Sequence, residues 1–270
     1  MFILLNKISK VILILTIALI FGITLGLKLL DITNNKKLEA ENTDIQKLYP
    51  NDFPDELYNR LPNKKVYLNI DEALKTPNDV YILNLRGKKL TSIPQSISNF
   101  KNLAIFIASN NNINQLPVEL GEISSLRMVD LSVNKIKQID PIVSLSNLRF
   151  LYLTDNEISA LPEDIGKMEK LLILRLNRNK LNKLPQSIGL MASLTSLNVN
   201  YNNLTEIPSE VGTMSNLHSL VISNNSISEL PSEITNLTKL KLIAVNKTKL
   251  SQDQLDQLQS SMPDLEIVTE

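Results

Sequence analysis

The side chains that most often carry chemistry are scarce in this chain. Of its 270 residues, none is cysteine and only His218 is histidine. The lack of cysteine excludes thiol catalysis, disulfide bonds and cysteine-based zinc sites. No catalytic triad can be assembled around the single imidazole. We therefore expect no catalytic residue, no metal ligand and no cofactor, and we expect that the protein is not an enzyme.

The charges of the chain are balanced, with 28 basic and 28 acidic residues. Nucleic-acid binders usually carry a basic excess, so we expect no nucleic-acid partner. A separate active site would need room outside the repeats described below, and residues 31–78 offer that room. They contain no Cys, no His, no glycine-rich phosphate loop and no metal-ligand spacing. This composition argues against an effector that uses the repeats only for targeting.

One polar residue type does recur at a regular spacing, and it is asparagine. Each of these asparagines follows a short apolar alternation, at a point where the chain must turn and leave backbone N–H and C=O groups inside the protein. A carboxamide supplies both a donor and an acceptor for such groups. We therefore predict a structural ladder that consists of Asn111, Asn134, Asn156, Asn179, Asn202 and Asn225.

The elements that position these asparagines come from an internal repeat of the form L-x-x-L-x-L-x-x-N-x-L. A block of about 23 residues cannot bury its own apolar face and must stack on its neighbours. The alternation around L-x-L predicts one short strand per block, with the leucines pointing inward, so that successive strands form a parallel sheet. Eight blocks begin at Val80, Leu103, Leu126, Leu148, Leu171, Leu194, Leu217 and Leu240, and the third is one residue shorter.

The second half of most blocks predicts a short turn rather than a long helix. A leucine or isoleucine is followed by proline, which fixes φ and cannot donate a ladder hydrogen bond. A glycine comes a few residues later, and we expect it to adopt the left-handed conformation that ends a helical turn. These glycines are Gly121, Gly166, Gly189 and Gly212.

The full pattern, L-x-x-L-x-L-x-x-N-x-L-x-x-L-P-x-x-I-G-x-L, resembles the leucine-rich repeat family. The closest likeness is to its 23-residue Leu-Pro subclass, which is found in bacterial proteins and in Ras-associated scaffold proteins. The match runs from Val80 to about Leu250. The resemblance implies an α/β solenoid, a horseshoe with a parallel sheet on its concave side, short 3₁₀ or helical turns on its convex side, and a cap at each end.

The resemblance also implies a binding surface, because members of this family generally bind ligands on the concave sheet. The outward strand positions of the first half of the arc form an apolar and aromatic centre with a charged rim, the composition of an interface hot spot. The alternative is that these side chains only favour strand formation. The candidate ligand-binding residues are Ile105, Ile107, Met128, Asp130, Phe150, Tyr152, Ile173, Arg175 and Arg178, with Asn198 and Tyr201 in the plainer second half.

The segments that flank the repeats predict caps. Residues 49–79 form the N-terminal cap, with a short helix over Asp71–Lys75 that ends before Pro77. Residues 80–250 are the eight repeats, and residues 251–270 form the C-terminal cap. Ser251 and Gln254 have the spacing of a capping box and predict a helix over Gln252–Ser260, followed by an edge strand over residues 265–268.

The N-terminus differs in kind from the rest of the chain. Two lysines precede an uncharged run of 17 residues, Val11–Leu27. This length lies between a signal-peptide core of ~7–15 residues and a membrane-spanning helix of roughly 20. Residues 1–30 are therefore an uncleaved signal anchor, which we favour, or a cleaved signal peptide, and residues 31–48 have the composition of a solvated linker.

These observations together predict a bacterial, non-enzymatic interaction module. If residues 8–30 stay in the membrane, the repeats are anchored outside the cytoplasm; if the segment is cleaved, the protein is secreted or periplasmic. The expected partner is a protein or a cell-envelope ligand that binds the concave face. A secreted, self-associating structural or adhesive protein is the alternative.

Overall fold

The computed structural model describes residues 55–270. The chain divides into two compact units, Met1–Asp55 and Glu56–Glu270. The predicted signal anchor and linker, and the start of the N-terminal cap, lie outside the described residues. Within residues 55–270 no helix combines the length and the apolar character needed to cross a membrane.

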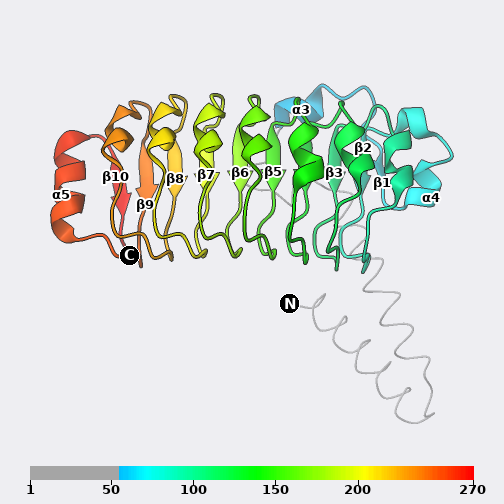
Figure 1. The fold of residues 1–270 in the computed structure, drawn as a ribbon. Coiled ribbons are helices and arrows are strands. Elements are labelled where there is room, and N and C mark those ends of the chain that lie inside the picture. The colour runs from blue at the N-terminus through cyan, green and yellow to red at the C-terminus, as the bar shows by residue number, and fades with distance from the viewer. Residues whose placement is uncertain (1–54) are drawn as a thin grey trace, which may run out of the picture. The chain divides into compact units, whose positions relative to one another are not determined.

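The second unit is built on one parallel sheet in which ten short strands pair in the order of the chain (Figure 1). Neighbouring strands are joined through one turn of the solenoid, so each outward position forms a straight row across the sheet. The strands are β1 (Val66–Tyr67), β2 (Ile82–Asn84), β3 (Ile105–Ile107), β4 (Met128–Asp130), β5 (Phe150–Tyr152), β6 (Ile173–Arg175), β7 (Ser196–Asn198), β8 (Ser219–Val221), β9 (Leu242–Ala244) and β10 (Glu266–Val268).

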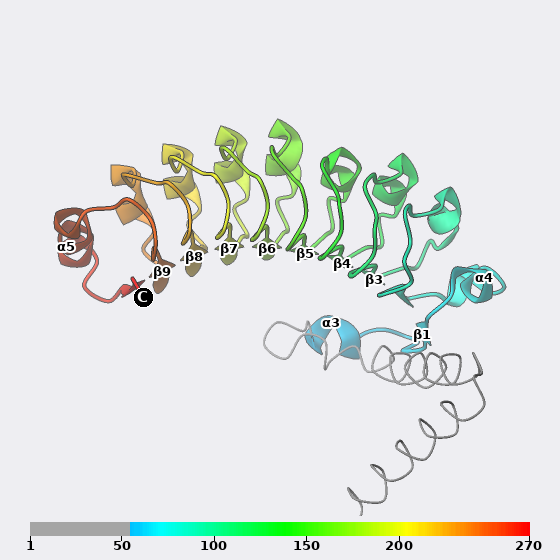
Figure 2. The ribbon, with the colours of Figure 1, turned by 90° about the horizontal axis from the view of Figure 1, so that it is seen from below.

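Short 3₁₀ helices cover the opposite side of each repeat, as the sequence predicted. Figure 2 shows the strands along the concave side of an arc and these turns along its convex side. In most repeats the proline stands immediately before the turn with an extended backbone, and the turn lasts five residues. The turns are η2 (Pro77–Asp79), η3 (Gln95–Asn99), η4 (Val118–Glu122), η5 (Asp140–Ser144), η6 (Glu163–Lys167), η7 (Gln186–Leu190), η8 (Ser209–Thr213) and η9 (Ser232–Asn236).

The apolar core lies between the sheet and the 3₁₀ turns. The middle residue of each strand points into it, as Leu83, Leu151 and Leu220 do, and all three are fully buried. The isoleucine, leucine or valine at the centre of each five-residue turn fills the core from the convex side. Burial of one such side chain contributes roughly 1.5–3 kcal/mol, and each repeat reaches this burial only against its neighbours.

Both ends of the sheet are closed by helical segments. At the N-terminal end lies α4 (Ile70–Ala73), and the side chain of Asn69 caps it by accepting from the N–H groups of Asp71 and Glu72. The other helix of this region, α3 (Asp55–Asn59), precedes β1 in the chain and has no buried residue. Helix α4 begins one residue earlier and ends two residues earlier than the predicted Asp71–Lys75, and Pro77 then starts the separate turn η2. The sequence patterns predicted neither α3 nor β1.

At the C-terminal end, α5 (Gln252–Ser261) follows the predicted bounds to within one residue. Ser251 and Gln254 form the predicted capping box, with each side chain bonded to the other residue's backbone N–H. Strand β10 then pairs with β9 and forms the last edge of the sheet. The prediction of a capped helix and a closing edge strand is therefore confirmed.

The predicted role of the repeat glycines is wrong. Among the described glycines only Gly87 has a positive φ, of 69°. The glycines at the ends of the turns are needed for space instead. A Cβ on Gly189 would lie 2.3 Å from the carbonyl oxygen of Glu210, and one on Gly121 would lie 2.2 Å from that of Pro141. Consecutive 3₁₀ turns therefore pack with the backbone of one against the bare Cα of the other.

Candidate functional site

The asparagine ladder is consumed inside the solenoid. The Nδ2 of Asn156 donates to the carbonyl oxygens of Leu131 at 3.0 Å and Leu153 at 3.1 Å. Its Oδ1 accepts from the N–H of Ile136 at 3.0 Å. One carboxamide thus joins two consecutive repeats, and the same set of bonds recurs at the other five ladder positions. These residues hold the sheet together and offer nothing to a ligand.

The sheet brings the predicted concave residues together in two rows. The register of the parallel strands aligns the first residue of each strand with the first residue of the next, and the third with the third. One row contains Ile105, Met128, Phe150 and Ile173, and the adjacent row contains Ile107, Asp130, Tyr152 and Arg175. The second row continues through Asn198 on β7.

The exposure of these side chains differs from the prediction. Ile105, Ile107 and Met128 have no solvent-exposed surface, and Asp130 and Tyr152 are 4% and 3% exposed. The four apolar or aromatic members of this group also lie outside the main apolar core. The binding role of the first half of the arc stays a prediction, and over β3 and β4 these side chains present little exposed area.

The open part of the concave face lies over the middle and later strands. Phe150, Ile173, Arg175 and Asn198 are half-buried, and the first residues of β7 and β8 are half-buried serines. Arg175 lies over the ring of Tyr152 at 5.7 Å from its centroid. This stretch combines an aromatic ring, an aliphatic side chain, an arginine and small polar groups on a rigid sheet, which is the composition of protein-binding surfaces.

Arg178 and Tyr201 lie beside the sheet rather than on it. Each directly precedes the ladder asparagine of its repeat, and both are exposed. The guanidinium of Arg178 lies 4.6 Å from the ring centroid of Tyr201, and its Nε lies 4.0 Å from a carboxylate oxygen of Asp155. The three side chains come from consecutive repeats and extend the open concave surface at one edge.

The backbone of the residue before the ladder position is left-handed in every repeat, which the sequence pattern did not predict. Asparagine, aspartate and glycine tolerate this conformation, and they fill the position in four repeats. In the other four the residue is Val133, Arg178, Tyr201 or Lys247, with φ of 57°, 55°, 51° and 53°. Val133 is β-branched and 47% exposed, so it is the most strained of these and the least suited to solvent.

One side chain at each edge of the sheet has a lowered pKa. The pKa of Glu157, at the edge that follows the strands, is lowered by a hydrogen bond from Lys180 and by the charges of Lys180, Lys137 and Lys135. The Lys180 Nζ lies 3.1 Å from the Glu157 carboxylate. At the opposite edge the pKa of Arg127 is lowered first by burial and then by the neighbouring charge of Arg149.

His218 lies exposed at the edge that precedes the strands, where its Nδ1 is 2.7 Å from the carbonyl oxygen of Asn216. Within residues 55–270 no three His, Cys, Asp or Glu side chains are grouped in a way that could hold a metal ion. A depression near the shortened third repeat, with a volume of about 800 Å³, is mainly polar and includes Lys137, Asp140 and Ser159.

Comparisons with known proteins agree with this architecture. The family described as leucine-rich repeat region matches residues 119–204, and the family described as leucine rich repeat matches residues 192–250. Among characterised proteins, adenylate cyclase of Schizosaccharomyces pombe is 35% identical over 96 residues, and the probable inactive serine/threonine-protein kinase roco10 of Dictyostelium discoideum is 34% identical over 112 residues. These matches cover 35% and 40% of this chain but only 6% and 4% of those proteins.

Solved structures with a similar fold include two internalins from Listeria monocytogenes. Internalin C2 superposes with a TM-score of 0.65 at 21% identity, covering 72% of this chain and 81% of that chain. The internalin inlF gives 0.64 at 22% identity, with 72% and 56% covered. The plant peptide hormone receptor RGFR1, solved in complex with RGF2, gives 0.61 at 26% identity, with 69% and 31% covered. With its repeats and its asparagine ladder, this is a leucine-rich repeat protein, which the two family models match over residues 119–250, and its fold is that of the internalin solenoids.

Proposed function

We propose that this protein is a non-enzymatic module that binds a protein or a cell-envelope ligand through the open part of its concave sheet. The observation that carries the proposal is the register of β5 to β8. It aligns Phe150, Ile173, Arg175 and Asn198 on consecutive strands, with Arg178 and Tyr201 beside them. A rigid sheet presents these side chains without an ordering cost on binding, which favours affinity.

The comparisons support a protein-binding role in general terms. Leucine-rich repeat proteins are typically interaction domains, and one of the similar structures is a receptor in complex with a peptide hormone. That partner belongs to the receptor alone. The partner of this chain is defined here only by the surface that it must fit, which is a curved strip lined by aromatic, aliphatic, basic and amide side chains.

The proposal includes a location. The uncharged run Val11–Leu27, with lysines before it, supports anchoring in a membrane with the repeats outside the cytoplasm, or secretion if the run is removed. The repeat subclass that we propose, the 23-residue Leu-Pro type, is compatible with a bacterial source. Mass spectrometry of the mature protein from its native cell tests the location, because a cleaved signal peptide leaves a new N-terminus and an anchor leaves the first residues in place.

Site-directed photo-cross-linking tests the binding surface. The chain has no cysteine, so a single introduced cysteine can be labelled without background. Ser219→Cys places a photoreactive maleimide on β8 of the concave sheet, and Thr235→Cys places the same group on the convex turn η9 of the same repeat. In extracts of the native cell the concave label should trap a defined partner, and the convex label should not.

Equal trapping from both positions, or none from either, would contradict a concave binding site. A cross-linked dimer of this chain from Ser219→Cys would favour self-association. Light scattering over a range of concentrations separates the two cases, because a self-associating protein forms a dimer that dissociates on dilution and a receptor stays monomeric.

A further inference from the structure

Charge is segregated around the solenoid although the whole chain is neutral. The convex 3₁₀ turns η3 to η9 carry seven acidic residues and one basic residue, Lys167. The basic residues of the repeats lie instead along the two edges that border the sheet. The acidic residues of the convex turns are Glu119, Glu122, Asp140, Glu163, Asp164, Glu210 and Glu233.

The first border, which we name the post-strand edge, lies after each strand. It consists of the residue at the ladder position of each repeat, the residue directly before it, and the residues after it up to the next helical turn or helix. It carries nine basic and four acidic residues. The acidic residues are Asp155, Glu157, Glu206 and Glu229. The basic residues are Lys88, Lys89, Lys135, Lys137, Arg178, Lys180, Lys183, Lys247 and Lys249.

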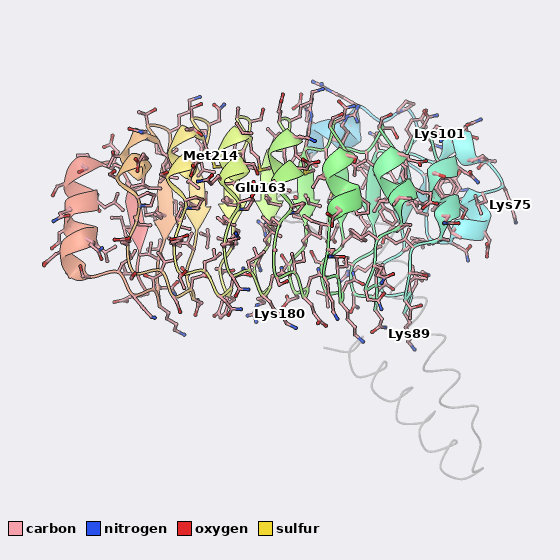
Figure 3. All side chains as sticks on the ribbon, viewed as in Figure 1. Lys75, Lys89, Lys101, Glu163, Lys180 and Met214 are labelled. Carbon is pink, nitrogen blue, oxygen red and sulfur yellow. The ribbon has the colours of Figure 1, made fainter. Side chains whose placement is uncertain are left out.

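The second border, which we name the pre-strand edge, consists of the residues between each 3₁₀ turn and the next strand. It carries six basic residues and one acidic residue, Glu169. The basic residues are Lys101, Arg127, Arg149, Lys170, Lys239 and Lys241. Figure 3 shows Lys89 and Lys180 along one border of the ribbon and Lys101 along the other, with Glu163 on the turns between them.

Two basic residues of the post-strand edge, Lys180 and Arg178, pair with Glu157 and Asp155, whereas several residues of the pre-strand edge bond to uncharged groups. On the pre-strand edge, Lys170 and Lys239 bond to the side chains of Asn147 and Asn216, at 2.8 and 2.6 Å, and an amide leaves the ammonium charge in place. Arg127 donates to two backbone carbonyl oxygens. On the post-strand edge, the lowered pKa of Glu157 reflects three lysines around one carboxylate.

The two basic edges border a strip that is only one strand long. A strand of three residues spans ~10 Å, so a ligand in the concave strip is within side-chain reach of both edges. Charge complementarity of this kind selects partners and raises association rates. A flat bilayer surface could meet only one edge of the curved sheet at a time. A narrow, extended ligand fits the arrangement, because it can lie along the strip between the two edges.

We propose that the ligand of the concave strip is an acidic polypeptide segment, whose carboxylates meet the pre-strand and post-strand edges while its centre contacts the sheet. This inference rests on the proposed function and adds the chemical class of the partner. The length of the segment follows from the sheet. Strands are ~4.8 Å apart, so the six gaps from β3 to β9 span about 29 Å and are matched by roughly nine extended residues.

The test uses the full chain in detergent and three fluorescent probes of that length: poly-L-glutamate, poly-L-lysine and a neutral Gly-Ser peptide. Fluorescence anisotropy should show binding of poly-L-glutamate alone, and the affinity should fall as salt is added because exposed charges are screened. Four glutamine substitutions on the two edges, at Lys137, Arg149, Lys170 and Lys183, should weaken binding about tenfold.

A matched variant controls for net charge. Glutamine substitutions at Arg60, Lys65, Lys75 and Lys167 remove the same number of positive charges from the N-terminal cap and the convex side. This variant should bind poly-L-glutamate with nearly unchanged affinity. Absence of poly-L-glutamate binding, or an equal loss in both variants, would overturn the inference. So would edge-dependent binding to vesicles with 30% anionic phospholipid in the absence of poly-L-glutamate binding, since the edges would then serve a lipid surface.

The two proposals fail in distinguishable ways. If poly-L-glutamate does not bind but the Ser219→Cys label still traps a partner, the concave face binds a ligand that is not acidic. If poly-L-glutamate binds and depends on the two edges but Ser219→Cys traps nothing, the ligand class stands and the site lies elsewhere along the edges.

Discussion

At the scale of single residues, the asparagine ladder shows how one side chain can link two repeats. Asn156 is 7% exposed, and its carboxamide satisfies backbone carbonyl oxygens of its own repeat and of the preceding one, as well as a backbone N–H of the preceding repeat. No other side chain of similar size offers donors and an acceptor in that geometry. The residue type is therefore fixed by the turn and not by a ligand.

Replacing Asn156 by leucine should lower the free energy of unfolding by about 3 kcal/mol, because buried backbone groups lose their partners at about 1–3 kcal/mol each. Urea denaturation followed by circular dichroism measures the change. Asn182 serves as the control. It is exposed in a loop of the next repeat, so its replacement by leucine should leave the free energy of unfolding nearly unchanged. A loss below about 1 kcal/mol for Asn156→Leu would show that the carboxamide is not needed.

Val133 should be a stabilising site for substitution. Its left-handed backbone, with φ of 57°, costs an L-residue roughly 1–2 kcal/mol, and a β-branched side chain suffers most. Val133→Asn should therefore raise the free energy of unfolding by about 1 kcal/mol. The reverse change at the same block position, Asn224→Val, should lower stability, and thermal unfolding of the pair measures both. If Val133→Asn leaves the melting temperature unchanged or lowers it, the strain is relieved in some other way.

Glu157 should titrate below its ordinary range. Its lowered pKa, caused first by the hydrogen bond from Lys180, means that the folded protein holds the carboxylate charged at a pH where an unfolded chain takes up a proton. The stabilising effect is thus present above the ordinary glutamate pKa and is lost as pH falls through the folded value. NMR titration of the Glu157 carboxyl carbon in Lys180→Ala should show a midpoint closer to the ordinary value, and an unmoved midpoint would contradict the assigned cause.

At the scale of elements, the stacking of the 3₁₀ turns sets which positions accept a side chain. The sequence placed each glycine correctly at the end of a turn but gave the wrong reason for it. Stacking distance is a property of two neighbouring repeats, and the residues of one block do not reveal it. The bare Cα of Gly189 admits the carbonyl oxygen of Glu210 in the next turn.

Gly189→Ala should destabilise the protein by about 1–3 kcal/mol, because the added Cβ overlaps backbone that cannot move without separating two turns. Ser98 occupies the same position of the turn in the first repeat, the fourth residue of η3, and already carries a Cβ. Ser98→Ala is therefore the matched control and should change stability by no more than about 0.5 kcal/mol. Comparable melting temperatures for wild type and Gly189→Ala would refute the close approach.

At the scale of the whole molecule, the periodic features of the sequence predicted the solenoid well. The leucines, asparagines and prolines recur in each block, and each position has the same environment in every repeat, so one interpretation served for all. The capped helix α5 was also predictable, because Ser251 and Gln254 carry a local signal.

The exposure of the candidate residues was harder to predict, because it depends on what surrounds a row and not on the row itself. The alternation placed Ile105 and Met128 correctly on the concave face, and the register brought them together, yet neither has exposed surface. The two-residue strand β1 and the left-handed backbone at Val133 carried no usable signal. The charge segregation was present in the sequence but becomes visible only when residues are assigned to edges and turns.

The affinity of the concave face for the partner recovered by cross-linking tests the central claim most directly. In Ile173→Asp combined with Tyr201→Ala, the equilibrium dissociation constant should rise about tenfold or more, as expected when central apolar and aromatic contacts are removed. Leu190→Asp, which alters an apolar side chain that is 66% exposed on the convex turn η7, should bind like the wild type. An unchanged affinity in the concave variant, or an equal loss in Leu190→Asp, would contradict the account.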